Sequence, residues 1–566
     1  MTFFRSPLFR HPTLLARKAA QRLQGHQPFT FSPCPTGAAW KAHDSLAPFL
    51  RAWAAASDLH DVVVPPNRIF RQEFELAELF DRCLSGPNTG TGLEADVKLI
   101  WEFSRAYHLV LNAARPATQA AGDAASFITT WLDTNRDPNG HAWTNAMEVA
   151  LRAVTWICAD ALYEGALRKS LGMERWLQTM HDHGSAIMAR LEAKRISSNH
   201  YLANLLGLAY IGAHLDTLQG RAWLHFARDE FPRALAAQSH QDGGAWEASL
   251  PYHALIMEMA VLFAVLHEPI SPGLRTSLDK GLQIVADFSC RGGDVFPFGD
   301  DDGGRVIAFD FASRSMGRAD VLLKAARILL GRDFIPQTDA LYESSGWWTC
   351  RRGELHAACE FGGVGFAGQG AHAHNDRLSF ALNLGGHAVF TDPGSYIYSP
   401  DPAARNAFRS TFAHSVLVID RWEQLPLPEG GGSSLFMLPG TDVAATVVDH
   451  QPGRLTVEDF PHRRSLAVTP ASIEITDDVS GAGPRRLAAQ FVLHPSITVT
   501  TRDNTAELKL PDGRGLRFTA PEGLEVRLRD GVFSPFYGTR ESTRLLVVEL
   551  SCSLPVRLLW RVDVTT

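Results

Sequence analysis

The sequence predicts an α+β multidomain protein in which antiparallel helix pairs are followed by stacked antiparallel β-sheets. Between about residues 70 and 335, apolar residues recur at a spacing of three to four, the period of helices with one buried face. From about residue 345 onward the period changes to two, and no helical segment separates the short apolar runs. Many closely spaced strands without intervening helices favour antiparallel sheets.

Several segments of the first region have a clear helical period. They are residues 97–109, 147–162, 185–193, 201–215, 254–266 and 319–330. Loops rich in Gly, Pro, Asn and Asp separate them, as in Asn-Arg-Asp-Pro-Asn-Gly at 135–140. Such loops join neighbouring antiparallel helices, so we expect a stack of helix pairs.

The second region contains short runs rich in Val, Ile, Leu and Phe. The clearest predicted strands are residues 455–460, 472–476, 496–500, 545–550 and 556–564. A chain of 566 residues is too long for one core and suggests two to four domains. We predict an N-terminal extension at 1–69 that packs on the helical domain at 70–335, and a β-sandwich domain at 345–566.

The composition argues against two classes of partner. The formal net charge at pH 7 is -7, so no overall positive field would hold a nucleic acid or an anionic membrane. Hydrophobic residues make up 45% and charged residues 20% of the chain, which is ordinary for a globular protein. An anionic ligand would therefore be held by a local group of Arg and Lys.

The cysteines and the N-terminal sequence suggest a location. The seven cysteines are dispersed and never form a Cys-x-x-Cys pair, which argues against a disulfide framework and against a thiolate zinc site. Residues 1–27 are basic but contain no apolar run of the length that a secretory signal needs, and no later segment is long enough to span a membrane. We therefore expect a cytoplasmic protein, with a periplasmic location less favoured.

Three short stretches concentrate residues that could carry chemistry: 370–380, 391–394 and 408–414. The apolar alternation in 378–384 and 416–419 predicts flanking strands. The polar residues would then lie at strand ends and turns, where a rigid sheet can bring them together.

A metal site is expected in these stretches. His374, Asp392 and His414 supply two imidazoles and one carboxylate, the ligand types that zinc prefers, with water or a fourth ligand completing the shell. His372 and His374 form a His-x-His pair, and the spacing does not decide which of them is the ligand.

Three further clusters lie where a loop enters a predicted helix of the first region, the end at which backbone donors point outward. They are 141–148 with Arg152, 198–201, and 243–247 with Tyr252 and His253. Each also allows a purely structural interpretation, with Asn199 as a helix cap, Trp143 as a core aromatic residue and Tyr252 as a buried phenol.

These motifs together resemble the heparinase II/III-like polysaccharide lyases. Ala-His-Ala-His-Asn-Asp, Asp-Pro-Gly and Phe-Arg-Ser-Thr-x-Ala-His occur here in the order found in that family. The resemblance extends over residues 101–105, 143–152, 198–200 and 247–252. It implies an N-terminal (α/α) toroid followed by a C-terminal antiparallel β-sandwich, with the active site formed between them.

The resemblance also implies residue roles. Asn199 and His200 would form the pocket for a uronate carboxylate, and Tyr252 and His372 would transfer protons. A structural zinc would be bound by His374, Asp392 and His414, and no organic cofactor is expected. We further predict substrate contacts from Trp143, Glu148, Arg152, Glu247, Arg405 and Arg409.

The expected reaction is β-elimination at a 4-linked uronic acid in an anionic oligosaccharide or polysaccharide, of the glycosaminoglycan or alginate kind. It requires neutralisation of the C6 carboxylate, a base for the C5 proton and an acid for the leaving O4. Asn and His side chains can stabilise the carboxylate as negative charge develops on it. Tyr and His can divide the acid and base roles between them. An imported oligosaccharide would suit a cytoplasmic enzyme.

Three alternatives remain open. A metal-dependent β-barrel oxygenase or isomerase could use the same His-x-His, Asp and His set, but it leaves Tyr252 and Asn199 without a task. A non-catalytic glycan-binding protein could use the metal only as a structural link. A toroidal glycoside hydrolase would need two opposed carboxylates, for which Glu148 and Glu247 are the obvious pair.

Overall fold

The computed structural model describes residues 28–59, 64–114, 120–194, 196–365, 370–430, 432–438 and 444–565. The chain divides into two compact units, and neither is continuous in sequence. The first comprises Met1–Ser239, Ala254–Leu282 and Arg305–Asp333, and the second His240–His253, Gln283–Gly304 and Phe334–Thr566. Two short segments of the helix-rich half therefore group with the β-rich half. The basic segment 1–27 lies outside the described residues.

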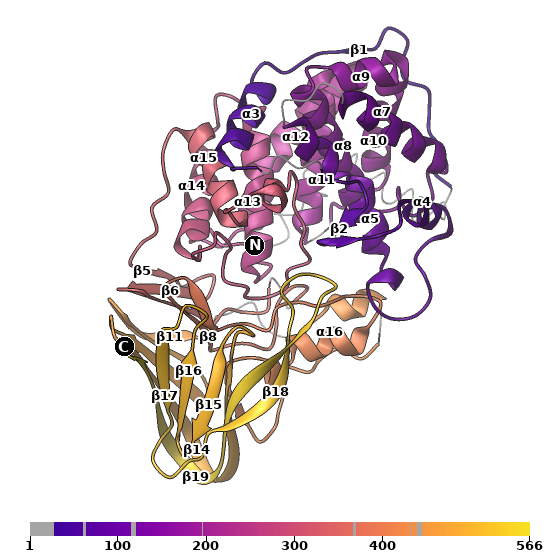
Figure 1. Cartoon of the computed structure of the whole chain (residues 1–566). Helices are drawn as coiled ribbons and strands as arrows, with labels where there is room; N and C mark the ends of the chain where they lie inside the picture. Colours follow the sequence, from indigo (N-terminus) through magenta and orange to yellow (C-terminus); the bar gives the residue numbers. More distant parts are fainter. Residues whose placement is uncertain are drawn as a thin grey trace. The chain divides into compact units, whose positions relative to one another are not determined.

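The first unit is built from helices (Figure 1). They are α3 (Leu46–Ala56), α4 (Leu76–Ser85), α5 (Val97–Arg105), α6 (Tyr107–Ala113), α7 (Ala120–Thr134), α8 (Ala146–Leu162), α9 (Ala166–Leu171), α10 (Met173–Ala189), α11 (Asn199–His214), α12 (Leu218–Ala237) and α15 (Arg318–Leu330). Helices α13 (Leu250–Val265) and α14 (Pro272–Asp287) each contribute residues to both units. Two short strand pairs, β1 (Ala39–Trp40) with β4 (Leu215–Asp216) and β2 (Arg68–Ile69) with β3 (Gln72–Glu73), complete this unit.

Helix α8 lies at the centre of the first unit. Asn145 caps its N-terminus, because the Asn145 side chain accepts hydrogen bonds from the backbone N–H groups of Met147 and Glu148. The helix is buried along nearly its whole length and packs against α3, α5, α6, α10 and α11. Gly207 of α11 permits a close approach to α8, since a Cβ atom there would lie 2.6 Å from the Cβ of Ala150.

The segment 97–109 differs from its prediction as one helix. It forms two helices, α5 and α6, because Ala106 adopts a left-handed conformation with φ of 58°. Asp96 caps α5 by accepting a hydrogen bond from the backbone N–H of Lys98 at 2.9 Å. Apolar periodicity continues across such a break, so the sequence pattern alone did not reveal it.

The second unit contains two antiparallel sheets. The first sheet has the strand order β5 (Asp339–Tyr342), β6 (Trp347–Arg352), β7 (Leu355–Glu360), β8 (Ser379–Leu384) and β9 (His387–Phe390). The second has the order β11 (Thr446–Gln451), β12 (Arg454–Asp459), β13 (His462–Val468), β14 (Ser472–Val492), β19 (Glu541–Thr565), β17 (Gly515–Thr519), β16 (Thr505–Lys509) and β15 (Thr498–Arg502). Strand β10 (Leu417–Ile419) adds to β14, and β18 (Arg527–Phe533) adds to β19.

One hydrophobic core joins the two sheets of the second unit. Phe380 and Phe390 of the first sheet and Phe491, Phe518 and Trp560 of the second belong to the same buried cluster. Each fully buried aromatic or aliphatic side chain of this kind contributes about 1.5–3 kcal/mol. The long strands β14 and β19 run side by side in the second sheet (Figure 1). These packed sheets form the predicted β-sandwich, and the predicted fold class is confirmed.

The sandwich brings distant segments of the chain to one sheet edge. Strands β8 and β9 are antiparallel, so the start of β8 and the end of β9 lie at the same edge. Asp392 follows β9, and helix α16 (Pro402–Arg409) and a short 3₁₀ turn at Thr411–Ala413 lead on to His414. None of the described helices combines the length and apolar character needed to cross a bilayer.

Candidate active site and metal centre

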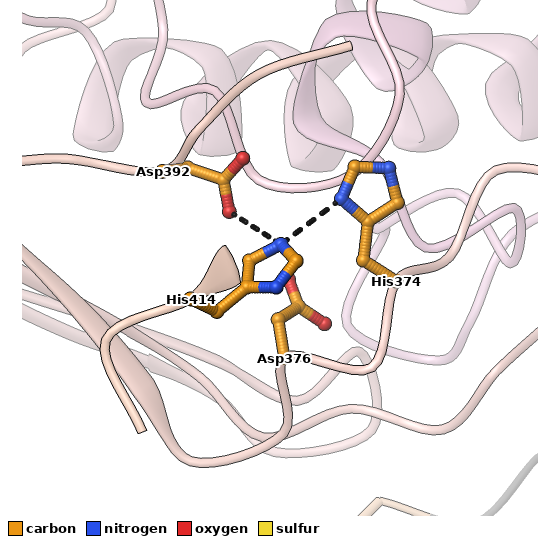
Figure 2. Close-up of side chains that lie close together, drawn as sticks. All are labelled: His374, Asp376, Asp392 and His414. Atoms are coloured by element: carbon orange, nitrogen blue, oxygen red, sulfur yellow. Dashed lines mark hydrogen bonds and ion pairs between the residues drawn. The ribbon is translucent and has the colours of Figure 1, made fainter. Parts of the chain in front are cut away.

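Four side chains converge at this edge of the sandwich (Figure 2). His374, Asp376, Asp392 and His414 each offer a ligand atom, and these atoms all lie within 4.8 Å of one another. All four residues are buried. The three predicted ligands are therefore brought together, and the structure adds Asp376. Its position two residues after His374 was the only signal in the sequence.

The two imidazole rings face each other with the ring nitrogens that carry no proton. His414 Nδ1 lies 2.8 Å from the backbone oxygen of Ser410, which can only accept, so Nδ1 carries the proton. His374 Nε2 lies 3.0 Å from the Asp300 carboxylate and donates to it. The remaining nitrogens, His374 Nδ1 and His414 Nε2, are 3.2 Å apart. In neutral imidazoles both carry lone pairs, an arrangement that a cation between them would stabilise.

The carboxylates reinforce this preference for a cation. Asp392 Oδ1 accepts a hydrogen bond from the backbone N–H of Gly394 at 2.9 Å. Its Oδ2 lies 3.4 Å from His414 Nε2 and accepts no hydrogen bond within the described part of the chain. Burial, together with the negative charge of Asp376, raises the pKa of Asp392. Two imidazole nitrogens and two carboxylates fit a tetrahedral zinc ion.

His372 lies in a second cluster beside the four ligands. Its Nδ1 lies 3.1 Å from Oδ2 of Asp300, so Nδ1 donates and Nε2 keeps its lone pair. The Tyr252 ring stacks on the His372 ring with a centroid separation of 3.6 Å. The Tyr252 hydroxyl lies 3.4 Å from the hydroxyl of Tyr398. Two predicted proton-transfer residues are thus in direct contact, and His374 is the member of the His-x-His pair that lies in the candidate metal group.

Asp300 connects the candidate metal group to the pair of His372 and Tyr252, because it is hydrogen-bonded to both His374 and His372. Besides both histidines, it accepts hydrogen bonds from Arg405, at 2.8 Å and 3.3 Å, and from Ser395 Oγ at 3.2 Å. Burial alone would raise the pKa of Asp300, but the Arg405 charge and the histidine hydrogen bonds hold it well below its ordinary value. Sequence reasoning missed this residue. It lies in the run Asp300-Asp301-Asp302, far along the chain from the histidines.

Tyr252 is a phenol rather than a phenolate in this environment. Burial, followed by the negative charges of Asp302 and other neighbours, raises its pKa well above the ordinary value. A neutral phenol can donate a proton, whereas the bare Nε2 of His372 can accept one. The geometry therefore favours Tyr252 as the acid and His372 as the base.

The two predicted anion-binding arginines differ in their surroundings. Arg405 is committed to Asp300 and to the backbone oxygen of Ala371 at 2.9 Å, and its guanidinium lies over the Tyr398 ring. Arg405 therefore organises the site instead of offering a free charge, which corrects its predicted role. Arg409 is also buried, and its Nε donates to the Asn406 side chain at 3.2 Å, but its two Nη atoms have no hydrogen-bond partner among the described residues.

Three predicted substrate contacts are interior residues of the first unit, and their role toward a substrate stays a prediction. Trp143, Glu148 and Arg152 are exposed by only 2%, 3% and 0%. Glu148 accepts two hydrogen bonds from Arg105, at 2.6 Å and 2.7 Å. Arg152 donates to His183 at 2.9 Å and stacks over the Trp143 ring. These side chains pack within the helical core of the first unit.

The other predicted site residues divide between the units. Asn199 is the buried first residue of α11, and Ser198 takes the cap position, so the interpretation of Asn199 as the cap is wrong. The His200 side chain is 36% exposed, and its Nδ1 lies 2.8 Å from Glu192. Both belong to the first unit, whereas Glu247, which is buried, belongs to the second.

Comparison with known proteins identifies relatives of the β-rich half. Residues 335–560 match the family model described as heparinase II/III-like, C-terminal. No match was found among curated protein sequences.

Solved structures resemble nearly the whole chain. Heparinase III superposes with a TM-score of 0.65 at 12% identity, covering 97% of this chain and 89% of its own. A mutant of heparan sulfate lyase HepC from Pedobacter heparinus gives 0.57 at 16% identity, covering 92% and 88%. Chondroitin AC lyase from Streptomyces coelicolor A3, solved with chondroitin sulphate, gives 0.51 at 13% identity, covering 93% and 83%. At these identities the similarity establishes the fold.

Proposed function

From the membership of residues 335–560 in the heparinase II/III-like C-terminal family, we infer that this chain is a polysaccharide lyase. Its substrate is an anionic glycan of the glycosaminoglycan kind with a 4-linked uronic acid. The observation that carries the proposal is the contact of Tyr252 with His372, with Asp300 orienting the imidazole. A base and an acid in van der Waals contact suit a reaction that removes one proton and delivers another nearby.

The proposed reaction is a β-elimination. His372 Nε2 removes the C5 proton, the C5–H electron pair forms the C4–C5 double bond, and the C4–O4 bond breaks. Tyr252 donates its phenolic proton to O4, which leaves as a hydroxyl of the neighbouring sugar. The product carries an unsaturated uronate at its new non-reducing end. Asp300 stabilises the imidazolium that His372 becomes.

Asn199 and His200 are proposed to neutralise the C6 carboxylate. The C5 proton becomes acidic enough to transfer only when negative charge on the developing enediolate is stabilised. An amide and an imidazole supply the hydrogen-bond donors for this task. Substrate contact by Glu247 also stays a prediction.

Zinc is proposed as a structural ion held by His374, Asp376, Asp392 and His414. When bound there, zinc would neutralise the paired carboxylates and fix the two imidazoles. His374 shares Asp300 with His372, so an ordered metal centre also orients the base. No organic cofactor is invoked. The reaction needs none.

Arg409 is the proposed site for a substrate carboxylate or sulfate. A guanidinium with two unbonded Nη atoms is suited to bidentate binding of such a group. The relatives support an anionic glycan, since one is named for heparan sulfate and another was solved with chondroitin sulphate. The uronate epimer, the sulfation pattern and the cytoplasmic location remain predictions.

The decisive test is ultraviolet absorbance of the unsaturated product. Purified protein is incubated with heparosan, heparan sulfate, hyaluronan, chondroitin and alginate, and the products are sized by chromatography. Absorbance growing with depolymerisation of at least one glycan is the expected result. Binding to glycans without product would favour a glycan-binding protein, and cleavage without absorbance would indicate hydrolysis. Hydrolysis is disfavoured because Glu148 is bound by Arg105 in the core.

A further inference from the structure

Arg464 of strand β13 is a fully buried guanidinium that is held firmly in place. It forms a bidentate ion pair with Asp477 of β14, with Nε–Oδ1 and Nη2–Oδ2 distances of 2.7 Å and 3.0 Å. Asp477 also lies 2.8 Å from His462 Nε2 and accepts a hydrogen bond from Trp560 Nε1 at 2.9 Å. Three strands of the second sheet therefore fix the orientation of this guanidinium.

The remaining nitrogen of Arg464 faces the metal-ligand segments. Nη1 donates to the backbone oxygens of Leu378 at 2.7 Å and Ser415 at 2.9 Å. Leu378 comes two residues after the ligand Asp376, and Ser415 comes directly after the ligand His414. One nitrogen thus joins the two segments that supply three of the four ligand side chains.

The Leu378 turn has a conformation that needs such support. Leu378 has a φ of 66°, in the left-handed region that bulky residues seldom adopt. The backbone N–H of Leu378 donates to the backbone oxygen of Glu360 at 2.8 Å. The backbone N–H of Ser379 donates to the backbone oxygen of Asp376, also at 2.8 Å. If Leu378 relaxed to a negative φ, the turn would rotate and the Asp376 carboxylate would leave the other ligands.

We propose that Arg464 is a positioning residue of the metal centre. It holds the Asp376 turn and the His414 segment at the separation that brings four ligand atoms together. Asp477 serves as its anchor in the sandwich. The proposal rests on the metal site and not on lyase activity, so it can be tested without any substrate.

The test measures zinc affinity of the full-length protein by competition with a chromophoric chelator. Arg464→Lys keeps the positive charge beside Asp477. A lysine ammonium group lacks the planar set of donors that makes the two hydrogen bonds to Asp477 and the two to the backbone oxygens of Leu378 and Ser415. We expect zinc to bind about tenfold or more weakly, the usual effect of losing a partner that orients ligands. The visible absorption bands of the cobalt-substituted protein should also change, because they report ligand geometry.

Arg351→Lys is the matched control. Arg351 in β6 also donates to two backbone oxygens, those of Asp287 at 3.1 Å and Ser289 at 2.6 Å, but neither segment carries a ligand. It should alter thermal stability while leaving zinc affinity within about twofold of the wild type.

The proposal is overturned by zinc affinity in Arg464→Lys within about twofold of the wild type, or by an equal loss in Arg351→Lys. A wild-type protein that binds no zinc overturns it as well. If Arg464→Lys does not fold, Asp477→Asn takes its place, because it weakens the anchor and leaves the guanidinium present. Asp477→Asn should then weaken zinc binding in the same direction, and an unchanged affinity would reject the proposal.

Discussion

The hydroxyl of Tyr252 is the smallest group on which the proposed chemistry depends. Tyr252→Phe keeps the ring stacked on His372 and deletes only the donated proton. We expect turnover to fall at least about a hundredfold, with the circular dichroism spectrum and melting temperature nearly unchanged. The rate of unsaturated product formation measures this.

Tyr210→Phe provides the comparison for that variant. The Tyr210 hydroxyl is buried and donates to the Leu262 backbone oxygen at 3.0 Å, within the first unit. Its loss should lower the melting temperature but leave turnover per folded molecule unchanged. A Tyr252→Phe variant that kept more than about a tenth of wild-type turnover would exclude Tyr252 as the acid.

At the residue scale, site residues could be predicted from the sequence only where their type and their order along the chain form a recognisable pattern. The convergence of His374, Asp392 and His414 could be predicted because the imidazoles and the carboxylate stand at strand ends. Asp300 could not be predicted as part of the site. Its contacts with the histidines depend on long-range packing, which brings residues 283–304 into the β-rich unit. The burial of Arg152 could not be predicted either, because a charged residue beside tryptophans looks the same in the sequence on a surface and in a core.

At the scale of elements, helix propensity and packing make opposite predictions at Gly207 of α11. Propensity alone says that Gly→Ala stabilises a helix by about 1 kcal/mol. A Cβ at Gly207 would lie 2.6 Å from the Cβ of Ala150, however, so α8 and α11 must separate. We expect Gly207→Ala to lower the free energy of unfolding by about 1–3 kcal/mol, measured by urea unfolding.

Gly122 in α7 is the matched position with open space. A Cβ there has no neighbour within 4 Å among the described atoms, so Gly122→Ala should stabilise the protein by a few tenths to about 1 kcal/mol. Equal effects of the two substitutions would contradict close packing between α8 and α11.

The ion pair between β13 and β14 makes stability depend on pH. Burial by itself would raise the pKa of Asp477, but Arg464 and His462 outweigh it and hold the pKa well below the ordinary 3.8. The unfolded chain therefore binds more protons at acidic pH, and the stabilisation by Asp477 is complete above about pH 5 and declines as the pH falls through 4 toward the folded-state pKa.

This linkage is measured with Asp477→Asn in the presence of a chelator, so that loss of metal does not contribute. The melting temperature of the wild type should exceed that of the variant by the largest amount near pH 6, and the gap should narrow toward pH 3. A gap that stays constant over this range would show that the Asp477 charge contributes no pH-dependent stability.

At the scale of the whole molecule, the predicted change of period between about residues 335 and 345 lies close to the end of α15 at Leu330 and the start of β5 at Asp339. The pattern could not show that residues 240–253 and 283–304 group with the sandwich, because periodicity describes local structure and not long-range packing. Tyr252 and Asp300 lie in those two segments. The β-rich unit therefore contains the proposed proton-transfer pair and the candidate metal ligands together.

This arrangement predicts that metal removal affects stability and turnover together. Chelation should lower the melting temperature, because metal binding free energy is part of the folding free energy of a structural site. Turnover should fall with it, since His374 and His372 share Asp300. Zinc added back should restore both, as followed by metal analysis, calorimetry and product absorbance.

His414→Ala should reproduce the effect of chelation, with lower metal content and a lower melting temperature. His450→Ala is its control, because His450 also pairs with a carboxylate, Asp339 at 2.7 Å, but is not a member of the candidate metal group. If chelation abolished turnover with no change in melting temperature and zinc restored it at once, the ion would be catalytic. A purified wild-type protein without stoichiometric metal would remove the metal centre from the mechanism and leave the Asp300–His372–Tyr252 contacts to act alone.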